Sequence, residues 1–357
     1  MRSKIFILLV GFCLLGSISA SINSFDSKDF GKLIQVSEDG QIYDADSNSS
    51  ISQKDLDAMF EAAAQGIVEC QFALGAFYQN GQFLLKNRLE ALAWYEKAAG
   101  QGHAESQFRL GKIFLNGDGV EVDYEKVRNW YTLASKNGHH KAKLHLGIIY
   151  GDGLGCDKNE SIAWNFFKES AAGGYHNASA LVGSYYFNGT IVKKDFKKAF
   201  QYFLQASEQG NEMAQFHLGL IYYQGHGLPI DYLESQKWYL MSAQQGFASA
   251  QHNLGASYIE GDYGEVDYEK GLHWLQQAAL QGSEIAQLNL AAFFLRNDTS
   301  YKNRIESYAW YNIAKANGND EAFEKLKSIE LTKSELLKAQ KLSTERFKLI
   351  QNNSSSQ

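Results

Sequence analysis

The chain has 357 residues, of which 32 are glycine, one is proline and three are cysteine, and its formal net charge is −6. Its 13% content of aromatic residues excludes a disordered or collagen-like chain, and three cysteines are too few for a disulfide framework. The negative charge argues against nucleic acid as a partner, because phosphate binding needs a basic face. Abundant glycine with almost no proline predicts many helices joined by short turns.

Residues 1–20 are typical of a secretory signal peptide. Arg2 and Lys4 precede an apolar run from Ile5 to Leu15, which small residues follow. The run is shorter than the roughly 20 residues of a membrane-spanning helix, and no later segment is long and apolar enough to span. We therefore expect an exported protein without a membrane span. Residues 21–50 are polar, and the stretch 33–43 predicts a hairpin.

A period of 36 residues governs residues 67–318, in seven rows without an insertion. A leucine or valine opens the pattern, glycine follows it in six rows, and aromatic residues stand four and twenty positions later. In the second row these residues are Leu110, Gly111, Phe114 and Trp130. A fixed period of this size is the signature of stacked structural repeats.

Each period predicts two helices. Small and apolar residues recur at helical spacing on both sides of a glycine-containing turn, and another glycine, such as Gly102, closes the second helix in a left-handed conformation. Glycine directly after the key leucine costs helix stability, about 1 kcal/mol relative to alanine. We therefore expect a tryptophan or tyrosine from the second helix to pack where a side chain would stand.

The motif L-G-x-x-Y-x-x-G-x-G, followed by D-x-x-K and W-Y, resembles the Sel-one-like repeat, a relative of the tetratricopeptide repeat. The resemblance implies an all-α fold, a right-handed α/α superhelical solenoid of helix-turn-helix repeats that serves as a protein-binding scaffold. Phe83, Ile191 and Tyr263 depart from the motif at its second turn glycine, and Asn297 and Thr299 replace both turn glycines in the seventh row.

Both ends of the array predict caps. Residues 51–66 repeat the second-helix pattern and form an N-terminal capping half-repeat. Residues 319–351 predict C-terminal capping helices, the last of which opens with a capping box from Thr332 to Glu335. Residues 352–357 are expected to form a disordered tail.

Catalytic and metal-binding motifs are missing from the sequence. Six of the nine histidines occupy recurring repeat positions and only His226, His252 and His273 fall elsewhere. No H-E-x-x-H or H-x-x-x-H pair and no serine-hydrolase motif occurs. We expect no enzymatic activity, no metal and no cofactor. Cys70 and Cys156 lie more than two repeats apart, too far for a disulfide, and Cys70 stands in a column of small buried residues.

The positions two and one before the key leucine, which we call the groove columns, are expected to face away from the core. In related tetratricopeptide arrays this face lines the concave groove. Exposed phenylalanines beside arginine, histidine and asparagine would offer a peptide both aromatic anchors and hydrogen-bond donors. The candidate ligand-binding residues are Phe72, Phe108, Arg109, His145, Phe216, His217, His252, Asn253 and Asn289. The alternative is that the aromatic residues pack against the next repeat.

The resulting hypothesis is an exported, non-catalytic scaffold that binds a protein or peptide partner, in the bacterial periplasm or as a secreted factor, in envelope processes or host-cell interaction. A lumenal adaptor of endoplasmic-reticulum quality control is one alternative, favoured by seven N-x-[ST] sites. A cell-wall glycan-binding or hydrolytic protein is another. It would need facing carboxylates, for which Asp152 and Glu260 are candidates.

Overall fold

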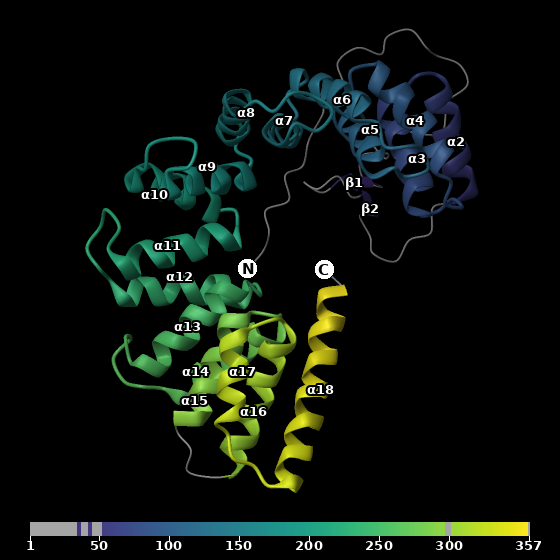
Figure 1. Ribbon diagram of the computed structural model, residues 1–357. Helices are drawn as coiled ribbons and strands as arrows, with labels where there is room; N and C mark the ends of the chain where they lie inside the picture. The colour runs from purple at the N-terminus through teal and green to yellow at the C-terminus, as the bar shows by residue number, and fades with distance from the viewer. Residues whose placement is uncertain (1–33, 37–41, 45–51, 297–300, 356–357) are drawn as a thin grey trace. The chain divides into compact units, whose positions relative to one another are not determined.

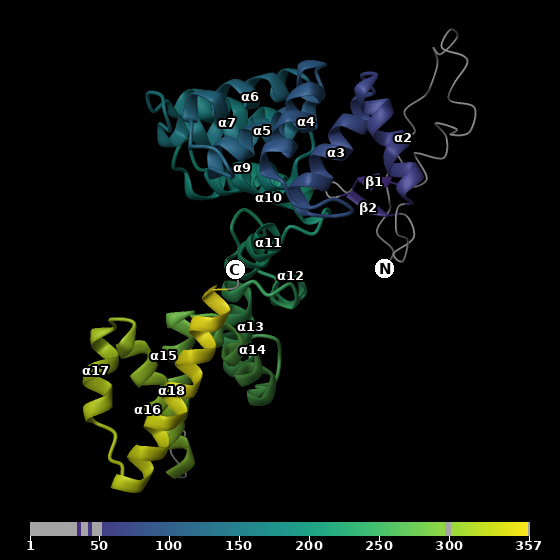
Figure 2. The ribbon, with the colours of Figure 1, turned by 90° about the vertical axis from the view of Figure 1, so that its right-hand side faces the viewer.

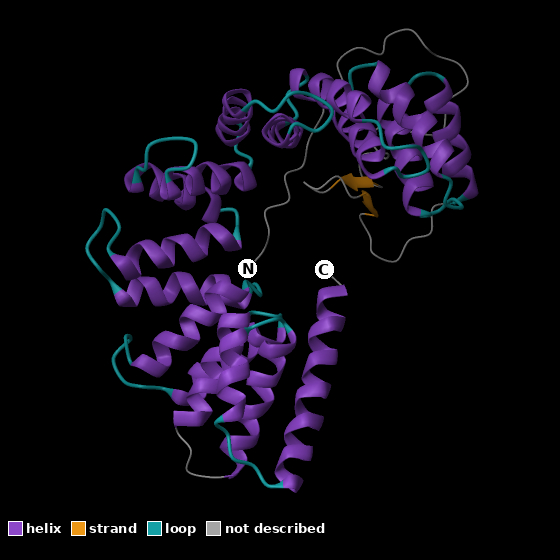
Figure 3. Ribbon diagram, viewed as in Figure 1, coloured by secondary structure: helices purple, strands orange, loops and turns teal. Residues whose placement is uncertain are grey.

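The computed structural model describes residues 34–36, 42–44, 52–296 and 301–355 (Figure 1). Within these residues the chain is almost wholly helical, which confirms the predicted all-α repeat solenoid (Figure 3). The predicted signal peptide lies outside the described residues, as do Asn297 and Thr299.

The predicted hairpin is confirmed by two short antiparallel strands, β1 (Ile34–Val36) and β2 (Ile42–Asp44). Their register pairs Ile34 with Asp44 and Val36 with Ile42.

Every period forms the expected helix pair. The first helices of the seven rows are α3 (Val68–Asn80), α5 (Ala104–Asn116), α7 (His140–Asp152), α9 (His176–Asn188), α11 (Glu212–Gln224), α13 (Ala248–Glu260) and α15 (Glu284–Arg296). The second helices are α4 (Arg88–Gly100), α6 (Tyr124–Lys136), α8 (Glu160–Ala172), α10 (Phe196–Ser207), α12 (Tyr232–Gln244), α14 (Tyr268–Leu280) and α16 (Tyr301–Ala316). The capping helices are α2 (Gln53–Ala64), α17 (Asp320–Lys327) and α18 (Lys333–Ser355).

The chain forms two compact units, Met1–Ala142 and Lys143–Gln357. In the first unit the core gathers Leu74, Phe77, Tyr95 and Leu110 from three consecutive helices. In the second unit the same columns supply a series of smaller clusters along the array. Its core side chains include Val182, Phe203, Leu218, Tyr239, Leu254, Leu290 and Trp310.

The ends of the helices follow from local chemistry. An aspartate or asparagine begins most second helices, as where the Asp123 carboxylate accepts a hydrogen bond from the backbone N–H of Lys126 at 3.0 Å. Gly102 follows α4 with φ of 89°, the predicted left-handed conformation, and Gly117 ends α5 in the same region with φ of 70°. Phe83, in the column of the second turn glycine, takes the same region with φ of 61°.

The glycine inside the first helix faces a ring in the first five rows: a tyrosine, as predicted, in rows one, two and five, and a phenylalanine in rows three and four. In the sixth row Gly255 faces Leu275 and the Gly271 carbonyl instead, and the seventh row has Ala291. A Cβ on Gly75 would stand 2.6 Å from the Tyr95 ring, and one on Gly111 would stand 2.3 Å from the Tyr131 ring. The ring comes from the column directly after the tryptophan column. The ring therefore lies directly against the helix backbone at this point, which explains the glycine despite its helix cost.

A ladder of amides joins neighbouring rows. Three positions before the key leucine, Gln107 donates from Nε2 to the Ala99 carbonyl at 2.9 Å and accepts from Asn137 Nδ2 at 2.9 Å. Gln107, Gln251 and Gln287 each tie the second helices of two consecutive rows to the first helix between them, and Gln71 ties α4 to the cap α2 in the same way. The amide pairs are Gln71–Gln101, Gln107–Asn137, Gln215–Gln245, Gln251–Gln281 and Gln287–Asn317.

The C-terminal cap begins as predicted but extends further. Thr332 and Glu335 exchange the two hydrogen bonds of a capping box at the start of α18. The helix lies alongside α16 in both views (Figures 1 and 2) and continues to Ser355, so the disordered tail predicted from residue 352 is wrong up to that residue. Asn353 anchors this end, because its Nδ2 donates to the Leu280 carbonyl at 3.1 Å.

Candidate functional site

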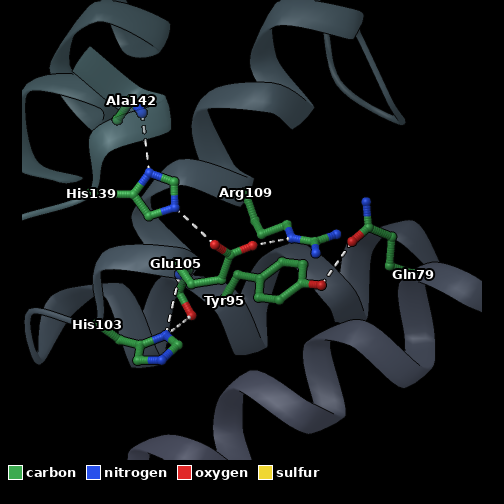
Figure 4. A network of polar contacts seen from close by, with 8 residues as sticks. Gln79, Tyr95, His103, Glu105, Arg109, His139 and Ala142 are labelled. Carbon is green, nitrogen blue, oxygen red and sulfur yellow. Dashed lines mark hydrogen bonds and ion pairs between the residues drawn. The ribbon is translucent and has the colours of Figure 1, made fainter. Parts of the chain in front are cut away.

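In the first unit Arg109 of the groove columns belongs to a largely buried charge network with Glu105 and His139. Arg109 donates from Nε to Glu105 Oε1 at 2.7 Å, and His139 Nε2 lies 2.8 Å from Glu105 Oε2. Figure 4 shows the Glu105 carboxylate between these two partners. The His139 ring also stacks on Phe108 with centroids 4.4 Å apart. The network thus joins α5 to the residue that opens the next row.

Backbone geometry selects the tautomer of the neutral ring of His139. His139 Nδ1 accepts from the backbone N–H of Ala142 at 3.1 Å, so it carries no proton. The proton of the neutral ring therefore lies on Nε2, which donates to Glu105. His103 caps α5 in the same way, through Nδ1 and the backbone N–H of Ser106.

Burial and charge act in opposite directions on this network. Burial alone would raise the pKa of Glu105, but the hydrogen bond from His139 and the adjacent Arg109 charge hold that pKa below its ordinary value. Burial lowers the pKa of His103, although Glu105 opposes the shift. These shifts favour an anionic Glu105 carboxylate and a neutral His103 imidazole.

The expectation of exposed phenylalanines is wrong in this unit. Phe72 and Phe108 are only 5% and 6% exposed, and Arg109 is only 9% exposed. Phe72 packs between Tyr95 and His103, with centroids 5.9 and 4.8 Å away. The Phe72 ring thus packs between its own row and the next, so it stabilises the stacking of the two rows at this face.

In the second unit the groove columns form a chain of polar groups. Asn289 Nδ2 lies 2.9 Å from His252 Nε2, and His252 Nδ1 lies 3.0 Å from Asn253 Oδ1. Asn253 in turn donates from Nδ2 to the Tyr239 hydroxyl at 3.1 Å. All three groove-column residues are half-buried. The structure therefore brings together three predicted site residues from α13 and α15.

Phe216 and His217 lie next to one another on α11 and are also half-buried. Phe216 packs against Tyr239 and against Phe247 at the start of the next row, with centroids 5.9 and 5.3 Å away. His217 lies flat on Phe203 with centroids 4.6 Å apart, and burial lowers its pKa to about 4. His145, on α7, is half-buried.

Other chemistry finds little support among the described residues. They contain no cluster of three potential metal ligands, and none of their helices is long and apolar enough to cross a membrane. Asp152 and Glu260 end α7 and α13, which are separated by α9 and α11, so the two are not facing carboxylates of one site. Cys70 is buried as predicted, and burial raises its pKa to about 12.

The family follows from the repeats. A family model for the Sel1 repeat matches residues 68–103, 104–139, 140–175, 176–211, 212–247, 248–283 and 285–319. The chain belongs to the Sel1 repeat family. Sel1 repeat proteins are in general protein-interaction scaffolds.

Solved structures share this architecture. A Sel1 repeat protein from Oxalobacter formigenes is 34% identical, with a TM-score of 0.56 over 63% of this chain and 92% of that chain. A protective antigen present in uropathogenic Escherichia coli strains, which displays an SLR fold, is 24% identical, with a TM-score of 0.57 over 83% of this chain and 80% of that chain. The second likeness shows the fold alone. No curated protein matches the chain.

Sequence reasoning missed the partners of these Sel1 repeat residues, chiefly Glu105, His139 and Tyr239. A signal for them exists in the spacing. Each groove-column phenylalanine is followed 31 positions later by the residue that opens the next row. That residue also carries a ring, and the two rings pack together, as for Phe72 with His103 and Phe216 with Phe247.

Proposed function

We propose that this Sel1 repeat protein is a non-catalytic scaffold that binds an extended peptide segment of a partner protein along the groove columns of its second unit. The observation that carries the proposal is the half-buried row of Asn289, His252 and Asn253. Amide and imidazole groups at the border of solvent can exchange hydrogen bonds with a peptide backbone, and Phe216 beside them offers apolar surface. In the first unit, buried rings and an internal ion pair occupy the same columns.

Selection of random phage-displayed peptides on the purified chain tests this proposal. Peptides enriched on the chain are expected to lose about tenfold in affinity for Asn289→Ala and for His252→Ala. Gln277→Ala, on the exposed surface of α14, is the control and should leave affinity unchanged. The proposal fails if no peptide is enriched, or if the enriched peptides bind both groove-column variants as tightly as the original chain.

We infer export from the charged, apolar and small-residue regions of residues 1–20, and a bacterial periplasmic or secreted setting fits best. Envelope processes or host-cell interaction are then the settings in which a partner would be met. Fractionation of bacterial cells that express the chain with and without residues 1–20 checks this. Equal retention of both forms in the cytoplasm would contradict export.

A further inference from the structure

The turns of the fourth, fifth and sixth rows form a continuous surface in the second unit. We call the aligned segments 193–198, 229–234 and 265–270 the turn edge; each contains the end of a turn and the start of α10, α12 or α14. His226, in the fifth-row turn, stacks on Phe196 with centroids 4.3 Å apart and an interplanar angle of 3°. The ring centroids of Tyr223 and Tyr232 lie 5.3 Å apart. The Tyr223 hydroxyl donates a hydrogen bond to Asp262 Oδ2 at 2.8 Å. Figure 3 shows the α11–α12 and α13–α14 turns on the same side.

Charge changes sign along this edge. The fourth-row segment holds four exposed lysines and one aspartate, Asp195. The Asp195 carboxylate pairs with the Lys198 ammonium and caps α10 by accepting from the backbone N–H of Lys198. No ion pair within the described residues joins Lys193, Lys194 or Lys197 to a carboxylate. This end of the turn edge therefore presents uncompensated positive charge.

The sixth-row segment is its counterpart. Asp267 caps α14 and pairs with Lys270 at 2.8 Å. Glu265 and Glu269 are exposed, and within the described part of the chain neither forms an ion pair. Between the two charged ends, the fifth row presents apolar side chains: Ile230 is 57% exposed and Leu233 is 61% exposed. Both carboxylates of the fifth-row segment already have partners, since Asp231 caps α12 and Glu234 pairs with Lys237.

The order positive, apolar, negative is self-complementary. A two-fold axis through the fifth row would set its apolar side chains against their own copies. The same axis would place the lysines of one chain opposite Glu265 and Glu269 of the other, at equal distances of one row on either side. An unrelated basic partner could use only the acidic end, whereas a second copy satisfies both ends and the apolar centre at once.

We propose that the turn edge is a self-association surface, on which a second copy of this chain docks about a two-fold axis through the fifth row. Three rows form a small interface with charged ends, so the dimer should depend on protein concentration and weaken as salt is raised.

Sedimentation equilibrium of the chain tests the proposal. We expect a monomer–dimer equilibrium that Lys194→Glu with Lys197→Glu weakens at least tenfold, and that Glu265→Lys with Glu269→Lys weakens to a similar degree. An equimolar mixture of the two double variants should dimerise again, because each then carries the charge that the other needs. Leu233→Asp should abolish the dimer, whereas Leu337→Asp, equally exposed on α18, should not.

Circular dichroism of every variant establishes that the helices are intact. A dissociation constant of about 100 µM is taken as the upper limit for a weak but specific interface. A chain that remains monomeric at that concentration would overturn the proposal. So would double variants that dimerise as the original chain does, or a mixture that stays monomeric when each double variant alone is also monomeric.

Discussion

Tyr239 lies against the backbone of Gly219, so that a Cβ on this glycine would stand 2.5 Å from Tyr239 Cδ1. No side chain fits at that distance unless the buried ring moves. The contact of glycine with a ring recurs in the first five rows, because the glycine column of the first helices meets the column directly after the tryptophans.

Gly219→Leu is therefore expected to lower the free energy of unfolding by about 2 kcal/mol or more, because the overpacking cost exceeds the helix propensity that leucine gains. Urea denaturation followed by circular dichroism measures it. Gly151→Ala, also within a helix of the second unit, is the matched control: its Cβ would make an ordinary 3.6 Å contact with Ala163, so a gain of up to about 1 kcal/mol is expected. A loss below about 0.5 kcal/mol for Gly219→Leu would refute the packing explanation.

Arg109→Glu is expected to destabilise the first unit by about 3 kcal/mol. The substitution would place a second carboxylate beside Glu105 in a largely buried position and remove the partner of the first. Lys112→Glu, exposed one turn further along α5, should change stability by less than about 0.5 kcal/mol. Thermal or urea denaturation compares the two. Equal stability of both variants would mean that the ion pair has no structural role.

The buried imidazole of His217 makes stability depend on pH. Its folded pKa of about 4 lies below the ordinary value of 6.5, so the unfolded chain binds the proton first as pH falls. The free energy of unfolding that neutral His217 contributes above pH 6.5 is therefore lost as pH falls to about 4. The loss amounts to up to about 3 kcal/mol. His217→Phe keeps the stacking on Phe203 and should remove this part of the dependence. Parallel stability profiles for the two chains between pH 7 and about 4 would contradict the prediction.

Gln251→Ala is expected to cost about 2 kcal/mol, because it leaves the buried Ala243 carbonyl and the Gln281 amide without their partner. A double-mutant cycle with Gln281→Ala measures how much of this loss belongs to the pair. Gln277→Ala, on the exposed side of α14, is the control and should be neutral. Additive losses for Gln251 and Gln281 would show that the rung does not couple the rows.

The fold was predictable because each repeated column reports one packing requirement several times. Leu110, Gly111 and their equivalents fixed the period, the helix pairs and the turns. The direction of Phe72 and Phe108 was not predictable from a helical projection, since a single helix does not show what the next row places against it. His103 and His139 supply that surface and bury both rings.

Site chemistry was predictable only in part, for the same reason. Asn253 and Asn289 were predicted as polar members of the groove columns, and they do lie with His252. The role of Glu105 depends on His139, which is 34 residues away in sequence, and no pattern within one helix reveals such a pair.

The amide ladder also has a consequence for how the second unit opens. In the third and fourth rows Lys143 and Ser179 stand where other rows have glutamine. Lys143 pairs with Glu169 at 3.1 Å and Ser179 bonds back to the Tyr175 carbonyl, so neither supplies an amide rung. Nearest-neighbour coupling in a repeat array sets where unfolding begins. Backbone amides of α8 and α9 should therefore exchange with deuterium sooner than those of α13 and α14, which gives the array a preferred point of local opening.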